Sequence, residues 1–142
     1  MNKRIEKMIK EYGDERDFFG AASDEAISKA EIALDVKFPA QYLEYVKKYG
    51  GGGIGGNEIT GVKDEGYASV LEATESWRKL GLPDKLFVVW GVDEYAYCMF
   101  SADANDEKVY TWSPDGDGLI FKSETFDAFI IDSFENTIAN WV

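Results

Sequence analysis

The side chains best suited to chemistry in this sequence are carboxylates, which gather in short turn-forming segments of its second half. Two carboxyl groups that face each other across a cleft can perform acid–base catalysis of the kind found in glycosidases. In a chain with 27 acidic residues, neighbouring acids also arise by chance, and solvated turns account for these positions. We therefore interpret them as surface charges. They are, in chain order, Asp93, Glu94, Asp103, Asp106, Glu107, Asp115 and Asp117.

Residues 113–124, SPDGDGLIFKSE, partly match the calcium-binding loop of an EF-hand. Asp115, Asp117 and Glu124 occupy the third, fifth and twelfth positions of that loop, but Ser113 replaces its first ligand. The preceding residues are typical of a strand, whereas the motif requires a helix. We therefore predict no metal site here, but a β-turn over PDGDG that joins two strands.

The glycine-rich run at 50–56 matches the dinucleotide-binding pattern G-x-G-x-x-G twice. In that motif the loop follows a strand and opens a helix, so that backbone N–H groups meet the phosphates. Here the glycines end a predicted helix. The run therefore predicts a turn, and no cofactor-binding residues are assigned.

The sequence contains no histidine and a single cysteine, Cys98. Histidine is the commonest general base, and histidine and cysteine are the main zinc ligands. These counts argue against zinc and leave only carboxylates for a Mg²⁺ or Ca²⁺ site. One cysteine also fits a reducing compartment, and we expect Cys98 in the core. We predict no catalytic residue and no cofactor.

The formal charge of the chain is 15 − 27 = −12, and it is unevenly distributed. Residues 1–80 carry 12 − 15 = −3, whereas residues 81–142 carry 3 − 12 = −9. Such a field repels nucleic acid and anionic membranes and speeds encounter with basic proteins, although acidity also serves solubility alone. No apolar stretch approaches the ~20 residues of a membrane span. These features predict a cytoplasmic protein that contacts neither nucleic acid nor membrane.

The first half of the chain has helical periodicity in four segments. We predict helices over 5–12, ended by Gly13, from Ser23 or Asp24 as N-cap to a stop before Phe38, from Pro39 to Gly50, and over 68–80. Gly50 is expected to cap the third helix in a left-handed conformation. The predicted buried faces contain Ile5, Met8, Ile9, Tyr12, Ile27, Ala30, Leu34, Tyr42, Val46, Tyr49, Val70, Thr74 and Trp77.

The second half is dominated by strand-forming residues and closes with a helix. Runs rich in Val, Tyr, Phe and Trp predict strands over 86–92, 95–100 and 107–112, and a further strand is expected around Ile59. A strong apolar stripe after Ser123 predicts a helix that covers the sheet. The sequence therefore predicts one α+β domain over 1–142 with an antiparallel meander. The stripe contains Phe126, Phe129, Ile130, Phe134, Ile138 and Trp141.

Residues 30–52, AEIALDVKFPAQYLEYVKKYGGG, resemble the opening signature of the SUKH superfamily. That superfamily includes the yeast cell-wall-synthesis regulator and many bacterial immunity proteins. The signature residues here are Glu31, Pro39, Tyr42 and Gly50, and the resemblance continues through the strands and last helix over nearly the whole chain. One departure is Phe100, where relatives often place an aspartate.

The resemblance implies a cytoplasmic immunity protein that binds and neutralises a bacterial toxin domain of nuclease type or of another chemistry. A nuclease domain needs basic residues to attract phosphates, so the charge of this chain makes the seven acids named above the candidate partner-binding residues. A regulatory or scaffold module without a toxin partner is the alternative. Glu31, Pro39, Tyr42 and Gly50 are expected to be structural. We expect Glu31 to pair with a basic residue or to cap the loop near residue 50.

Overall fold

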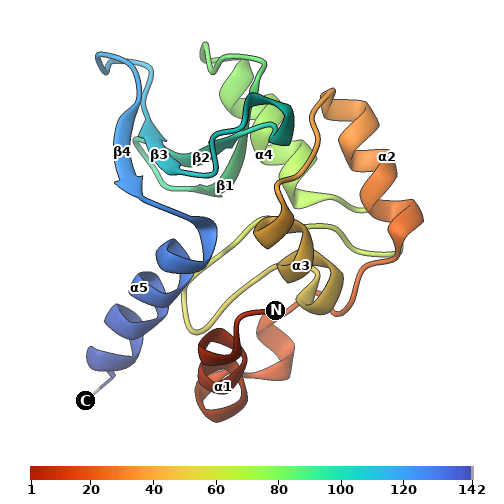
Figure 1. The fold of residues 1–142 in the computed structure, drawn as a ribbon, viewed down its shortest axis with the longest axis vertical. Helices are drawn as coiled ribbons and strands as arrows, with labels where there is room; N and C mark the ends of the chain where they lie inside the picture. The colour runs from red at the N-terminus through yellow and green to blue at the C-terminus, as the bar shows by residue number, and fades with distance from the viewer. Residues whose placement is uncertain (142) are drawn as a thin grey trace.

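The computed structural model describes residues 1–141 and has the predicted α+β architecture (Figure 1). Helices precede a four-stranded antiparallel meander, and a long helix closes the chain. The helices are α1 (Lys3–Tyr12), η1 (Glu15–Asp17), α2 (Asp24–Leu34), α3 (Ala40–Tyr49), α4 (Ser69–Arg78), η2 (Ala102–Ala104) and α5 (Phe126–Ala139). The strands are β1 (Leu86–Gly91), β2 (Ala96–Phe100), β3 (Val109–Trp112) and β4 (Ile120–Ser123).

Most helix boundaries follow the predicted capping residues. The Ala26 backbone N–H donates to the Ser23 hydroxyl at 3.2 Å, and α3 starts directly after Pro39. Gly50 ends α3 with φ +77°, in the region that favours glycine. The last helix begins after Thr125 rather than after Ser123, because Ser123 is still paired with Val109 in the sheet.

The sheet has the simplest meander order, β1-β2-β3-β4. Its register pairs Gly91 with Ala96 and Ala96 with Trp112. The PDGDG segment forms the predicted β-turn, in which the Gly116 N–H donates to the Ser113 carbonyl at 3.2 Å. The turn is followed by β4, which forms one edge of the sheet.

Both faces of β1 and β2 are buried. On one face, Phe87 and Met99 pack into the main core with α3 and α5, and the Tyr42 and Phe87 ring centroids lie 5.0 Å apart. On the other face, Val88 and Cys98 belong to a second cluster in which α4 supplies Ala73 and Trp77. The burial of Cys98 is as predicted.

The strand predicted around Ile59 is absent, although Ile59 itself is buried. The segment touches β1 through a single ladder bond, from the Thr60 N–H to the Val89 carbonyl at 2.9 Å. On its other side, the Gly52 N–H donates to the Ile59 carbonyl at 2.7 Å. Gly61 packs closely on the Gly50 backbone, so the segment lies against the glycine run rather than forming a regular ladder with β1.

Some aromatic positions differ from the predicted burial. Tyr12 and Trp141 are 43% and 51% exposed and pack against each other edge to face, with ring centroids 6.2 Å apart. Tyr49 is only half-buried, whereas Tyr45, which was not among the predicted core residues, is fully buried. The predicted apolar faces of the helices therefore point to the core, but the residues at the ends of these faces lie outside it.

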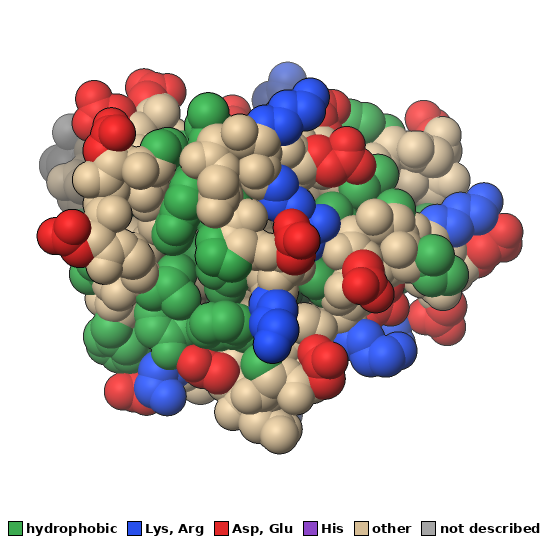
Figure 2. Space-filling view, turned by 90° about the horizontal axis from the view of Figure 1, so that it is seen from above, with side chains coloured by type: hydrophobic (Ala, Val, Ile, Leu, Met, Phe, Trp, Pro, Cys, Tyr) green, Lys and Arg blue, Asp and Glu red, His purple; other side chains and the backbone are tan. Residues whose placement is uncertain are grey.

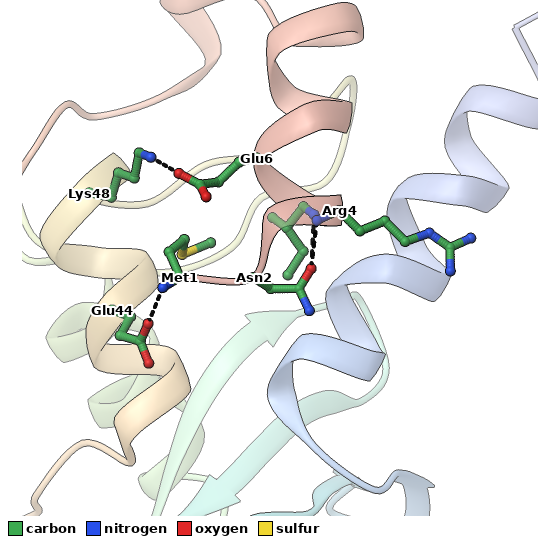
Figure 3. A network of polar contacts seen from close by, with 7 residues as sticks. Met1, Asn2, Arg4, Glu6, Glu44 and Lys48 are labelled. Atoms are coloured by element: carbon green, nitrogen blue, oxygen red, sulfur yellow. Dashed lines mark hydrogen bonds and ion pairs between the residues drawn. The ribbon is translucent and has the colours of Figure 1, made fainter.

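Ion pairs join the N-terminal segment to α3 (Figure 3), and a further pair joins α1 to α5. The Met1 amine lies 2.7 Å from the Glu44 carboxylate on α3, and Lys48 of α3 pairs with Glu6. The Arg4 guanidinium reaches Glu135 on α5 at 2.7 Å. These exposed pairs are individually weak, and Ile5, which is fully buried, anchors α1 in the core.

Candidate protein-binding surface

The meander divides the seven predicted acids into two groups at opposite ends of the sheet. β1 and β3 run in the same direction, so the turns that follow them lie at one end, and the connection after β2 lies at the other. We call the first group the hairpin end, which comprises Asp93, Glu94, Asp115 and Asp117. We call the second the η2 end, which comprises Asp103, Asp106 and Glu107.

Most of these carboxylates lack a compensating charge. Six of the seven are exposed, and those six have no Lys or Arg partner within 4 Å among residues 1–141. Asp106 is the partly buried member, and Lys108 lies 4.0 Å from it. Because little of this charge is neutralised locally, both ends of the sheet project a negative field into solvent.

Asp106 has a defined structural role at the η2 end. It accepts hydrogen bonds from the Tyr110 hydroxyl at 2.6 Å and from the Lys108 N–H at 3.0 Å. Partial burial opposes its ionisation, but these hydrogen bonds outweigh it and lower the pKa of Asp106. The same hydrogen bond to the carboxylate raises the pKa of Tyr110 to about 12. The pair therefore holds the Tyr110 ring in one orientation.

Asp93 also borders a cleft of about 590 Å³ between α4, the glycine run and the end of β1. Three further acids line this cleft, and no Lys or Arg does. They come from separate parts of the chain, so no local spacing in the sequence indicates them. The lining carboxylates are Asp17, Glu58, Glu72 and Asp93, and Phe19, Tyr67 and Trp77 form aromatic walls.

Of the four signature residues, Glu31 has neither of the partners expected for it. Its carboxylate accepts the Phe38 backbone N–H at 2.7 Å, and thus caps the α2–α3 turn rather than the loop near residue 50. No basic partner of Glu31 is seen within 4 Å among the described residues. Tyr42 is fully buried, and its hydroxyl donates to the Thr60 carbonyl at 3.0 Å.

The remaining reactive groups are secluded or scattered. Burial raises the pKa of the Cys98 thiol to about 12, which keeps it protonated near neutral pH. Across residues 1–141, no three Asp, Glu or Cys side chains are arranged to hold a metal ion. No helix in the same range is long and apolar enough to cross a membrane.

These features define an α+β protein whose sheet carries acidic turns at both ends. A family model described as SUKH_5, SMI1-KNR4 cell-wall, matches residues 1–135. The match covers nearly the whole chain, and the protein belongs to this SUKH family.

Proposed function

We propose that this protein is a cytoplasmic immunity protein, which neutralises a bacterial toxin domain by direct contact and catalyses no reaction. The observation that carries the proposal is the set of uncompensated carboxylates at the two ends of the sheet and in the cleft. A nuclease toxin needs Lys and Arg to attract phosphates. A surface of this kind therefore complements it and competes for its nucleic-acid site.

The charge has a second consequence, which concerns rate. Opposite net charges steer two proteins together and raise the association rate at low salt. For an immunity protein a fast encounter is useful because the toxin must be captured before it acts. We therefore expect binding of the partner to weaken and slow as ionic strength rises.

The test begins with a search of the adjacent genes for one that encodes a toxin domain, whose product is then purified in a catalytically inactive form. The variant carries Glu94→Gln, Asp115→Asn and Asp117→Asn at the hairpin end. The control carries Glu11→Gln, Glu65→Gln and Glu75→Gln, which are exposed acids outside the candidate surface. Both variants have the same net charge, so any difference between them reports position rather than total charge.

We expect the hairpin-end variant to bind at least about tenfold more weakly by calorimetry, with a smaller salt dependence, while the control binds like the wild type. Co-expression with the active toxin should then fail to protect cells only for the hairpin-end variant. Equal affinity of the two variants would contradict the acidic surface. A wild-type protein that neither binds nor protects would refute the immunity function.

A second candidate function is a regulatory or scaffold role, which the cell-wall description of the matching family favours. Such a module binds several partners and needs no toxin. Absence of a toxin gene beside this one, together with recovery of cell-wall synthesis proteins as direct binders, would support it over immunity.

A further inference from the structure

The face of β3 and β4 turned away from the main core carries aromatic and aliphatic side chains that are partly or largely exposed. Tyr110 belongs to the cluster on that side of the sheet, and Phe121 lies directly opposite it in the register, so the two share a face. Phe121 is 52% exposed. We call this surface the aromatic face, formed by Phe100, Tyr110, Trp112, Leu119 and Phe121 and bordered by Leu80.

The aromatic face is open because α4 covers only the neighbouring part of the sheet. That helix packs on β1 and ends at Arg78, and the next residues pass close to the Trp112 ring at Gly81. Leu80 in this connection is 57% exposed. Figure 2 shows a continuous band of hydrophobic side chains on the side where β4 lies in Figure 1, with acidic side chains at its margins.

The aromatic rings are held in place before any partner binds. Tyr110 is fixed by its hydrogen bond to Asp106 and packs edge to face on Phe100, with ring centroids 5.8 Å apart. Trp112 packs edge to face on Trp77 at 6.3 Å. Rigid Trp and Tyr side chains lose little conformational entropy on binding and dominate the energetics of many interfaces.

Carboxylates flank this face at both ends of the same strand. Asp106 and Glu107 precede β3, and Asp115 and Asp117 follow it. The two lysines within residues 106–124 are engaged, since Lys108 lies 4.0 Å from Asp106 and Lys122 lies 3.7 Å from Asp132. The surface is thus an apolar centre with an acidic rim, which is the usual arrangement of a protein interface.

We infer that the aromatic face docks a protein segment whose apolar side chains are flanked by Lys or Arg. The inference rests on the proposed function because it takes the partner to be a basic protein. It adds that the partner binds to the aromatic face through apolar contacts. Charge complementarity selects this occupant over a second copy of the chain, because two copies would bring their acidic rims together.

The test uses two synthetic peptides of equal charge, four Lys-Leu repeats and four Lys-Ser repeats, titrated against the full chain while tryptophan fluorescence is recorded. Three proteins are compared: the wild type, Phe121→Ser, and Ile32→Ser as the control. Ile32 is 77% exposed on α2, so its substitution removes an equally accessible apolar side chain from another surface. Leu80→Ser serves as a second test variant if Phe121→Ser does not fold.

We expect the Lys-Leu peptide to bind the wild type at least about tenfold more tightly than the Lys-Ser peptide. Phe121→Ser should weaken Lys-Leu binding about fivefold or more, and Ile32→Ser should leave it unchanged. Equal binding of the two peptides, or equal effects of the two substitutions, would overturn the inference. So would a dimer in sedimentation that Phe121→Ser dissolves, since the face would then serve self-association.

Because the peptides involve no toxin, their failure leaves the proposed function intact. Conversely, if the wild-type protein neither binds the toxin nor protects cells but the peptides behave as expected, the immunity function fails and the docking face stands.

Discussion

The Glu31 carboxylate accepts the Phe38 backbone N–H at 2.7 Å and so closes the turn between α2 and α3. Phe38 is buried, and its ring contacts both Tyr42 and Phe87, with centroids 5.0 Å and 5.1 Å away. One carboxylate therefore fixes the approach of α3 to the sheet. The role of Glu31 is structural. This explains why the signature combines it with Pro39 and Tyr42, which lie in the segment that this hydrogen bond positions.

Removing this acceptor should destabilise the fold. Glu31→Ala leaves the Phe38 N–H without its partner and is expected to lower the free energy of unfolding by about 1–3 kcal/mol. Glu31→Gln keeps a neutral acceptor and should cost less. Urea denaturation measures both, with Glu25→Ala as the control, because Glu25 lies exposed on the same helix. Equal stability of the Ala variants at 31 and 25 would contradict the capping role.

Gly50 should tolerate no side chain. Its φ is +77°, and a Cβ atom there would overlap the Gly20 carbonyl oxygen and lie 2.7 Å from the Phe19 Cβ. We expect Gly50→Ala to lower the free energy of unfolding by more than about 2 kcal/mol. Gly56→Ala is the matched control, since nothing lies within 4 Å of a Cβ atom at that position. Similar melting temperatures for the two variants would exclude this packing.

Neutralising Asp106 should ease ionisation of Tyr110. The hydrogen bond to the Asp106 carboxylate raises the pKa of Tyr110 to about 12. In Asp106→Asn the negative charge is gone, so the pKa should fall toward the ordinary value of about 10. Carbon-13 NMR titration of the labelled tyrosine ring reports it directly. Asp103→Asn is the control, since it removes a charge from the same η2 end and should not change the pKa of Tyr110. If Asp106→Asn did not change that pKa either, the hydrogen bond between Asp106 and Tyr110 would not be formed.

Stability should fall with rising pH partly because of Cys98. Burial raises the pKa of its thiol from 9.0 in the unfolded reference to about 12 in the fold. The resulting stabilisation is complete at pH values below the pKa of the unfolded state. It is lost as pH rises through the pKa of the folded state. Between these values the thiol contributes a loss of about 1.4 kcal/mol per pH unit.

Reducing urea titrations between the two pKa values measure this slope. Cys98→Ala lowers stability overall by leaving a cavity, but it should flatten the pH dependence relative to wild type. Buried tyrosines such as Tyr42, whose pKa burial also raises, contribute equally to both proteins. If the free energy of unfolding depended on pH in the same way for both proteins, the Cys98 thiol would have no raised pKa in the fold.

The sequence was informative wherever local chemistry controls the backbone. Proline before α3, glycine after it and a serine cap on α2 gave those boundaries correctly, because each acts through its own φ preference or a neighbouring N–H. The strand at Ile59 was predicted wrongly since its β-branched neighbours fit an extended chain equally well without a partner strand. The observed contacts of this segment, such as that of Gly61 with Gly50, are tertiary and cannot be read from local sequence.

In the candidate surface, too, only the features set by local sequence could be predicted. The acidic turns of the meander were visible in the sequence, since turn residues and carboxylates occur together there. The cleft carboxylates Asp17, Glu58 and Glu72 were missed because three distant segments bring them together. Exposure of Phe121 was likewise hidden, because a strand residue looks the same in sequence whether or not a helix covers it.

The meander order has a consequence for how this protein diversifies. Both acidic ends and nearly all of the aromatic face lie in one uninterrupted stretch, residues 93–121. Along β3, Tyr110 and Trp112 on the aromatic face alternate with Val109 and Thr111, which point to the opposite face. Substitutions within this one short segment can therefore change the proposed docking face while the core packing of helices α1 to α3 stays the same.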